Sequence, residues 1–177
     1  MEIRLATTDE MENVRDFYFR LISDMANMKY QPAWKKAVYP SDVLITDSIK
    51  NGELYVVPAD DEEHDYMGAM IMNREYNFDY SNVKWSIKAE KDEIEVIHLL
   101  GVPVVFQGQG IATFMVEESK KIAKEKGARA IRLDVLDTNL PAHQLYQKAG
   151  FAYVDSLNEP YEDGQPSKFL LYEYVLD

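Results

Sequence analysis

Two glycines, Gly108 and Gly110, stand between a long apolar run and a stretch with helical spacing of apolar residues. A helix N-terminus leaves unpaired amides and a partial positive charge, and glycines just before it let a phosphate approach the backbone closely. The spacing therefore indicates a phosphate-binding turn. A glycine pair alone is weak support, because glycines also serve any tight turn from a strand into a helix.

Two other phosphate-binding motifs are excluded by their spacing. The dinucleotide fingerprint requires a third glycine at position 113, where the chain has Thr113. The P-loop pattern GxxxxGK[ST] occurs nowhere in the sequence. The turn therefore belongs to neither of these classes.

Two motifs about 30 residues apart resemble those of the GNAT superfamily of N-acetyltransferases. The coenzyme motif of that family, Gln or Arg, two residues, Gly, one residue, Gly or Ala, reads here Gln107-Gly108-Gln109-Gly110-Ile111-Ala112. The preceding Leu100-Gly101-Val102 matches the family's Leu-x-Val, and Asn139, Ala142, Leu145-Tyr146, Lys148 and Gly150-Phe151 follow its second motif. The match is strong over residues 93–154, and before residue 93 it rests only on the order of the expected helices and strands. Val104 stands where the family often has Pro.

The resemblance implies an enzyme that passes an acetyl group from acetyl-CoA to a primary amine by direct transfer in a ternary complex. Two strands would separate near Leu100 to Val102, leaving free amides for the pantetheine arm, and amides of residues 108–113 would bind the pyrophosphate. The implied coenzyme-binding residues are Leu100, Gly101, Val102, Gln107, Gly108, Gln109, Gly110, Ile111, Ala112, Thr113 and Asn139.

The resemblance also supplies a candidate acid. Tyr146 aligns with the family's tyrosine near the coenzyme sulfur, where a phenol with a pKa of about 10 can protonate the departing thiolate. The alternative is a tyrosine that packs a short helix onto the sheet.

Two residues of the strand before the coenzyme motif are candidates for the base. Alternation places His98 on the same face as Val96, Leu100 and Val102, where a neutral imidazole could take a proton from the ammonium. A buried histidine with one structural hydrogen bond explains the same pattern. Glu95 is the competing base, on the opposite face unless a β-bulge reverses the assignment.

Aromatic residues upstream are candidates for the acceptor pocket. Trp34 and Tyr39 fall between the first two expected helices, and aromatic faces can hold a cationic amine. Core packing explains Trp34 equally well. The acidic run at residues 60–65 contains metal-capable side chains, but its density of like charge is more typical of a solvated turn, so no metal is expected.

Hydrophobic periodicity indicates the elements that position these residues. Strands are expected at residues 2–5, 53–57, 66–72, 93–105, 130–136, 151–154 and 168–176. Helices are expected at residues 8–27 behind a Thr7–Glu10 capping box, from Ser41 to about 51 with Val43, Leu44 and Ile49 inward, from 111 to the Gly127 cap, and from Pro141 to Gly150. The order βααβββαβαββ predicts an α/β fold. The resemblance implies that this fold is GNAT-like, with a central sheet that is mixed but mostly antiparallel and is flanked by helices.

Length and composition limit the class of protein. The 177 residues, 46% hydrophobic, fit one domain over residues 1–177. A formal net charge of -12 makes nucleic acid or an anionic membrane an unsuitable partner. The same charge suits an amine-bearing acceptor, either a small molecule or a protein N-terminus. The acidic composition is equally explained by solubility. With no cysteine, there is no acyl-cysteine route.

Neither a signal peptide nor an apolar run of about 20 residues is present, so a cytoplasmic protein is expected. The sequence leaves open the oligomeric state, a homodimer included, and the identity of the acceptor. Two other classes also remain. One is a non-catalytic acyl-CoA-binding sensor, and the other is an interaction domain in which the glycine turn is structural.

Overall fold

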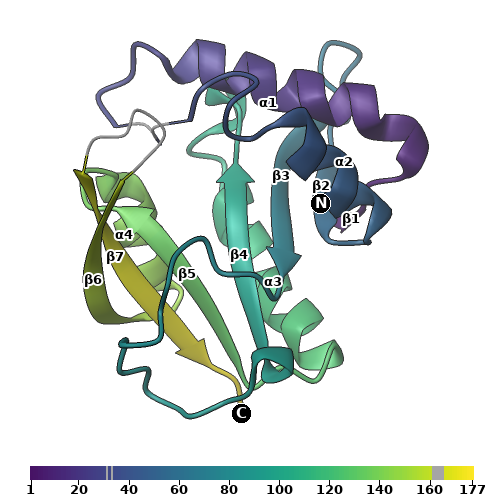
Figure 1. Ribbon diagram of the computed structural model, residues 1–177. Helices are drawn as coiled ribbons and strands as arrows, with labels where there is room; N and C mark the ends of the chain where they lie inside the picture. Colours follow the sequence, from purple (N-terminus) through teal and green to yellow (C-terminus); the bar gives the residue numbers. More distant parts are fainter. Residues whose placement is uncertain (31, 33, 161–165) are drawn as a thin grey trace.

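A seven-stranded sheet, in the order β1-β2-β3-β4-β5-β7-β6, forms the centre of the molecule (Figure 1). The computed structural model describes residues 1–30, 32, 34–160 and 166–177. The strands are β1 (Arg4–Leu5), β2 (Leu54–Pro58), β3 (Tyr66–Asn73), β4 (Ile94–Gly101), β5 (Ala130–Leu136), β6 (Ala152–Pro160) and β7 (Pro166–Val175). Neighbouring strands are antiparallel except β4 and β5, which are parallel.

Helices cover both faces of this sheet, which confirms the predicted mixed α/β class (Figure 1). The helices are α1 (Met11–Met25), α2 (Asp42–Lys50), α3 (Ile111–Glu125) and α4 (Leu140–Lys148), with 3-10 helices at Thr8–Glu10, Lys91–Glu93 and Val104–Phe106. One core joins α1 and α2 to alternate residues of β2 and β3. A second core joins α3 and α4 to the opposite face. Strand alternation divides the apolar residues between these two layers.

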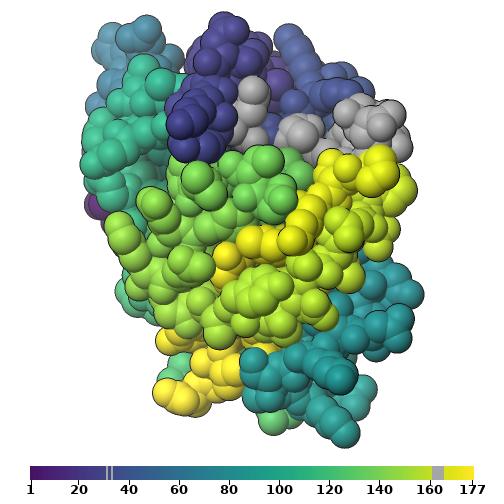
Figure 2. Space-filling view, turned by 90° about the vertical axis from the view of Figure 1, so that its left-hand side faces the viewer, coloured from purple at the N-terminus to yellow at the C-terminus, as the bar shows by residue number. Residues whose placement is uncertain are grey.

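The connection between β3 and β4 covers the part of the sheet that α1 and α2 leave open. It crosses in front of β5 and β7 in Figure 1, and Figure 2 shows it in teal beside β6. Tyr80 and Val83 are buried against Leu171 of β7, with Phe78 and Trp85 packed around them. The segment is irregular, but its aromatic side chains form a small core that supports one wall of the site described below.

The helix starts show how local sequence signals are used. The Thr7–Glu10 capping box is present, and the Ser41 hydroxyl accepts a hydrogen bond from the Leu44 amide at 3.1 Å, as predicted. The expectation that Val43 faces inward is wrong, because this side chain is 68% exposed. Ile49 is buried as expected, and Ile45, four residues earlier on the same helix face, is buried with it.

β4 is interrupted, and this interruption decides the shape of the site. Its pairing with β5 extends only from Ile94 to Val96, and its register with β3 shifts beyond His98. Leu99 has φ of +53°, an unusual conformation for a branched residue, and the Tyr18 hydroxyl donates to its carbonyl oxygen at 3.0 Å. Beyond Val96 the two parallel strands separate (Figure 1).

The bulge corrects one sequence-based assignment. His98 lies on the same face as Val96, but Leu100 and Val102 pack into the core on the α3 face. Simple alternation fails because Leu99 and Leu100 together occupy the place opposite a single residue of β3. The strand expected over residues 93–105 accordingly ends at Gly101. In the part of the chain that the structure describes, no helix combines the length and apolar character needed to cross a membrane.

Candidate active site

Two adjoining cavities occupy the region where β4 and β5 separate. The glycine-turn cavity, about 590 Å³, lies between the end of β4, the start of α3 and the start of α4. The interstrand cavity, about 430 Å³, lies between β4 and β5. Their common lining residues are Pro32, Trp34, Leu100, Asn139 and Ala142. The two spaces therefore meet at one wall.

The glycine-turn cavity contains ten of the eleven residues expected to bind coenzyme. These are Leu100, Gly101, Val102, Gln107, Gly108, Gly110, Ile111, Ala112, Thr113 and Asn139. The exception is Gln109, whose exposed side chain donates from Nε2 to the Val105 carbonyl oxygen at 3.0 Å. The residues at the end of α1 and just after it, in dark blue in Figure 2, lie above α4 and complete the opposite wall.

The backbone at the turn is arranged to receive an anion. Gly108 and Gly110 have φ of +75° and +82°, and no atom lies within 4 Å of where a Cβ would stand on either. The first helical hydrogen bond of α3 runs from the Phe114 amide to the Gly110 carbonyl oxygen, so the amides of residues 111–113 lack intrahelical partners. Among the described lining residues, Lys29 is the one charged side chain. The free amides at the start of α3, the dipole of this helix and the Lys29 ammonium all favour a negatively charged ligand in this cavity.

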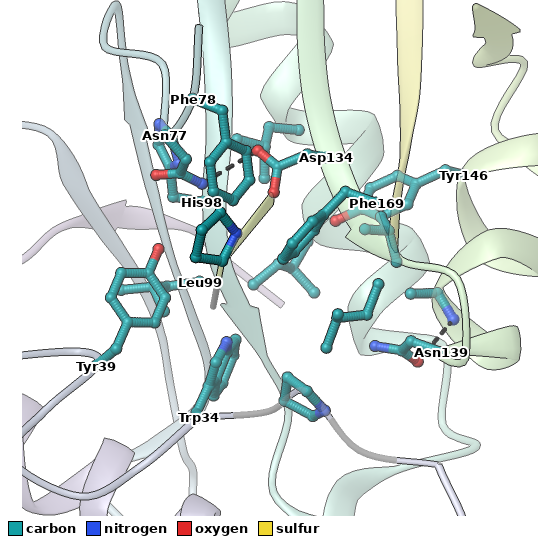
Figure 3. Close-up of a pocket in the computed structure, with 17 residues that line it drawn as sticks. Trp34, Tyr39, Asn77, Phe78, His98, Leu99, Asp134, Asn139, Tyr146 and Phe169 are labelled. Atoms are coloured by element: carbon teal, nitrogen blue, oxygen red, sulfur yellow. Dashed lines mark hydrogen bonds between the residues drawn. The ribbon is translucent and has the colours of Figure 1, made fainter. Parts of the chain in front are cut away.

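The interstrand cavity holds His98, Asp134 and Tyr146 (Figure 3). Its walls are aromatic, with Trp34, Tyr39, Phe78 and Phe169 among the lining side chains. Trp34 packs edge-to-face on Tyr18, with ring centroids 6.1 Å apart, and lines both cavities. The structure thus brings together His98, Tyr146, Trp34 and Tyr39.

The surroundings of His98 determine which ring nitrogen can act as a base. Nε2 lies 3.0 Å from the Asn73 Oδ1 and 3.0 Å from the Glu75 carbonyl oxygen. A carbonyl oxygen can only accept, so Nε2 carries the hydrogen and Nδ1 holds the lone pair of the neutral ring. Burial lowers the pKa of His98, and the negative charge of Asp134 opposes this shift. The neutral imidazole therefore persists to a lower pH than in an ordinary histidine.

Asp134 is a functional candidate that the sequence analysis missed. Its Oδ2 accepts hydrogen bonds from the Tyr80 hydroxyl at 2.7 Å and the Asn77 Nδ2 at 3.1 Å. Burial raises the pKa of Asp134, opposed by these donors and by His98. The overlooked signal is the pair Arg132 and Asp134, two charged residues on one face of an otherwise apolar strand.

Tyr146 presents its hydroxyl to the interstrand cavity from α4 (Figure 3). The side chain is 6% exposed, and burial, followed by the charge of Asp134, raises its pKa above the usual value. The start of α4 is fixed by Asn139, whose Oδ1 accepts from the Ala142 amide at 3.4 Å, and by Pro141 in the first turn. Because its pKa is raised, the phenol of Tyr146 stays protonated at neutral pH.

Glu95 lies apart from these groups. It is 1% exposed and lines neither cavity. Its two carboxylate oxygens lie 3.3 Å from the Arg74 Nε and 3.3 Å from the Lys126 Nζ. The bulge follows His98, so it leaves Glu95 and His98 on opposite faces. Within the described ranges, no group of three or more His, Cys, Asp or Glu side chains is placed to hold a metal ion.

Comparison with known proteins places this arrangement in a family. Residues 11–151 match the family described as acetyltransferase (GNAT) family. An uncharacterized N-acetyltransferase of Methanocaldococcus jannaschii is 23% identical over 149 residues, which cover 84% of this chain and 59% of that protein.

Solved structures share the fold. A GNAT-family acetyltransferase from Streptococcus agalactiae is 19% identical with a TM-score of 0.77, over 99% of this chain and 95% of that one. Arabidopsis thaliana NAA60, solved in complex with acetyl-CoA, is 17% identical with a TM-score of 0.70. The match covers 98% of this chain and 97% of that one. Since the family match extends over most of its length, the chain belongs to the acetyltransferase (GNAT) family of acyltransferases.

Proposed function

We propose that this protein transfers the acetyl group of acetyl-CoA directly to a primary amine in a ternary complex. The observation that carries the proposal is the meeting of two cavities where β4 and β5 separate. One has the features of a phosphate-binding turn, and the other contains groups that can exchange protons. Trp34, Asn139 and Ala142 lie where the two spaces meet, which is where acetyl transfer would occur.

The glycine-turn cavity fits acetyl-CoA. Gly108, Gly110 and the free amides at the start of α3 would hold the pyrophosphate, with Lys29 adding positive charge. Leu100 to Val102, at and just beyond the end of β4, have no β5 partner and would offer backbone groups to the pantetheine arm. Acetyl-CoA supplies an activated carbonyl carbon and a thiolate leaving group.

His98 is the proposed base. A primary amine attacks only after it loses a proton, and Nδ1 of the neutral imidazole would accept that proton, directly or through water. The lowered pKa of His98 keeps this nitrogen unprotonated at neutral pH. Glu95, held between Arg74 and Lys126 outside the cavities, is assigned a structural role instead.

Tyr146 is the proposed acid. As the amine nitrogen bonds to the carbonyl carbon and the carbon–sulfur bond breaks, the phenol would donate a proton to the departing thiolate. The second proton that the nitrogen loses as the amide forms would restore the phenol, directly or through water. A raised pKa ensures that Tyr146 holds this proton at the start of the reaction. The chain contains no cysteine, which agrees with direct transfer rather than an acyl-cysteine intermediate.

The test measures thiol release from acetyl-CoA over a panel of primary amines, together with acetyl-CoA binding by calorimetry. Tyr146→Phe should lower kcat by about 100-fold and leave the acetyl-CoA Kd unchanged. Tyr153→Phe, at a tyrosine that is 54% exposed on β6, is the matched control and should behave as wild type. An unchanged kcat in Tyr146→Phe would remove this residue from the mechanism.

Two further results would overturn the proposal itself. Acetyl-CoA binding without turnover on any amine would instead favour a sensor of the coenzyme. Failure to bind any CoA compound at millimolar concentration would favour an interaction domain with a structural glycine turn.

A further inference from the structure

The two oxygens of the Asp134 carboxylate have different surroundings. Oδ2 accepts both hydrogen bonds, from Tyr80 and Asn77. Oδ1 has no hydrogen-bond partner among the described residues, and Figure 3 shows the second oxygen directed into the cavity, away from Asn77. One oxygen is therefore anchored, and the other remains available to a ligand.

No cation of the described protein neutralises this carboxylate. Arg132, two residues earlier on the same strand face, is committed to the Glu173 carboxylate at 2.9 Å and to the Tyr76 hydroxyl at 2.8 Å. Neither lysine nor arginine is present among the described residues that line the interstrand cavity. Asp134 is partly buried, and a carboxylate withdrawn from bulk water without a cation is energetically costly, so a bound ammonium would supply the missing charge.

The remaining walls suit the rest of a small amine. Trp34, Tyr39, Phe78 and Phe169 provide aromatic surface, and a volume of about 430 Å³ accommodates a small molecule. Aromatic faces attract cations and also bury an apolar body. Asp134 is the one carboxylate among the described lining residues, so the cavity matches one positive charge.

From these contacts we propose that the acceptor is a small primary monoamine with an apolar body, and that Asp134 Oδ1 binds its ammonium group. This inference rests on the proposed acetyl transfer. His98 and Asp134 each lie two residues beyond the last paired position of β4 and β5, Val96 and Arg132, on the same face of the sheet. An ammonium held by the carboxylate would thus stand beside the imidazole that receives its proton.

The test uses equilibrium binding, so it does not depend on turnover. Calorimetry with the enzyme saturated with CoA compares benzylamine, an ammonium ion at neutral pH, with benzyl alcohol, its neutral analogue. Wild type should bind benzylamine at least about 10-fold more tightly than benzyl alcohol. Asp134→Asn should raise the benzylamine Kd by about 10- to 100-fold and change the benzyl alcohol Kd by less than about threefold. Asp137→Asn, at an exposed carboxylate just beyond β5, is the matched control and should behave as wild type.

Several outcomes would overturn the inference. Equal binding of the two ligands by wild type would show that charge is not recognised, whatever the stability of the variant. Equal losses for both ligands in Asp134→Asn would show a structural role for the carboxylate. Tighter binding of 1,4-diaminobutane than of butylamine would contradict the single-charge requirement. Selective benzylamine binding without thiol release would instead leave the inference standing and overturn the proposed transfer.

Discussion

The imidazole of His98 and the carboxylate of Asp134 line the same cavity, each two residues beyond the last paired position of its strand. In an unbroken parallel ladder the two positions would be neighbours. The bulge at Leu99 and the separation of β4 from β5 convert that neighbouring pair into the two sides of a binding space. Each group influences the pKa of the other, but no hydrogen bond joins them.

Replacing His98 tests the base. We expect His98→Gln to lower kcat about 100-fold with little change in acetyl-CoA affinity, because Nδ1 is lost from the cavity while the glycine turn is untouched. The control His64→Gln changes a histidine bonded to Asp61 outside both cavities and should retain full activity. Comparable kcat values for His98→Gln and wild type would assign the proton transfer elsewhere.

The pH dependence of the wild type gives an independent check on His98. Burial lowers the pKa of His98 from its usual 6.5, so the neutral imidazole persists as the pH falls through 6.5. We therefore expect kcat to remain level on acidification through that pH and to decline only at lower values. A profile of kcat against pH that already halves at or above 6.5 would contradict this assignment.

The glycine turn permits a matched comparison of three alanine substitutions. Gly108, Gly110 and Gly127 all have positive φ and open space around the missing Cβ, but Gly127 lies at the far end of α3. Each change to alanine should cost about 1 kcal/mol of stability through backbone strain. The acetyl-CoA Kd, measured by calorimetry, should rise about 10-fold for Gly108→Ala and Gly110→Ala only. An equal effect of Gly127→Ala would point to strain rather than to the phosphate cradle.

Glu95 should prove structural. Glu95→Gln removes a buried charge from between Arg74 and Lys126, and we expect a loss of about 2 kcal/mol in the free energy of unfolding, with kcat unchanged. The control Glu117→Gln, at a half-exposed residue paired with Lys120, should cost less than about 0.5 kcal/mol. Denaturant unfolding and thiol release measure the two properties separately. A large fall in kcat at full stability would restore Glu95 as the base.

Acid sensitivity should involve Glu10. The hydrogen bond from Arg4, assisted by the Thr7 amide and Tyr66, lowers the pKa of Glu10 from 4.5 to about 2. A lowered folded-state pKa contributes stability above the unfolded value, and that contribution is lost as the pH falls from 4.5 toward 2. We expect Glu10→Gln to destabilise the protein by about 1 kcal/mol at pH 7, since the pair is partly solvent-screened, and by less at pH 3. A stability difference that grows on acidification would contradict the assignment.

The glycine turn was predictable because it is formed by the backbone of one local segment. A glycine turn between a strand and a helix is a local feature, so the spacing of Gly108 and Gly110 predicted the start of α3, and the second motif downstream linked the turn to the coenzyme. Ten of the eleven expected residues line one cavity. Gln109 is the exception, because its side chain bonds back to the Val105 carbonyl oxygen.

The acceptor half depended on contacts between distant segments. Alternation placed His98 with Leu100, but the bulge moved Leu100 to the other face. Asp134 faces the cavity beside Tyr80 and Asn77, more than 50 positions earlier in the sequence.

The sequence by itself determined the element types, the two helix caps and the glycine turn before α3, because each depends on residues within one turn or strand. The tertiary structure alone decided which charged groups are paired. Arg132 and Glu173 satisfy one another, Glu95 is held by Arg74 and Lys126, and Asp134 is left with an oxygen free in the cavity. The effect of a charge depends on the solvent and partners that surround it, and these are set only when the strands are brought together.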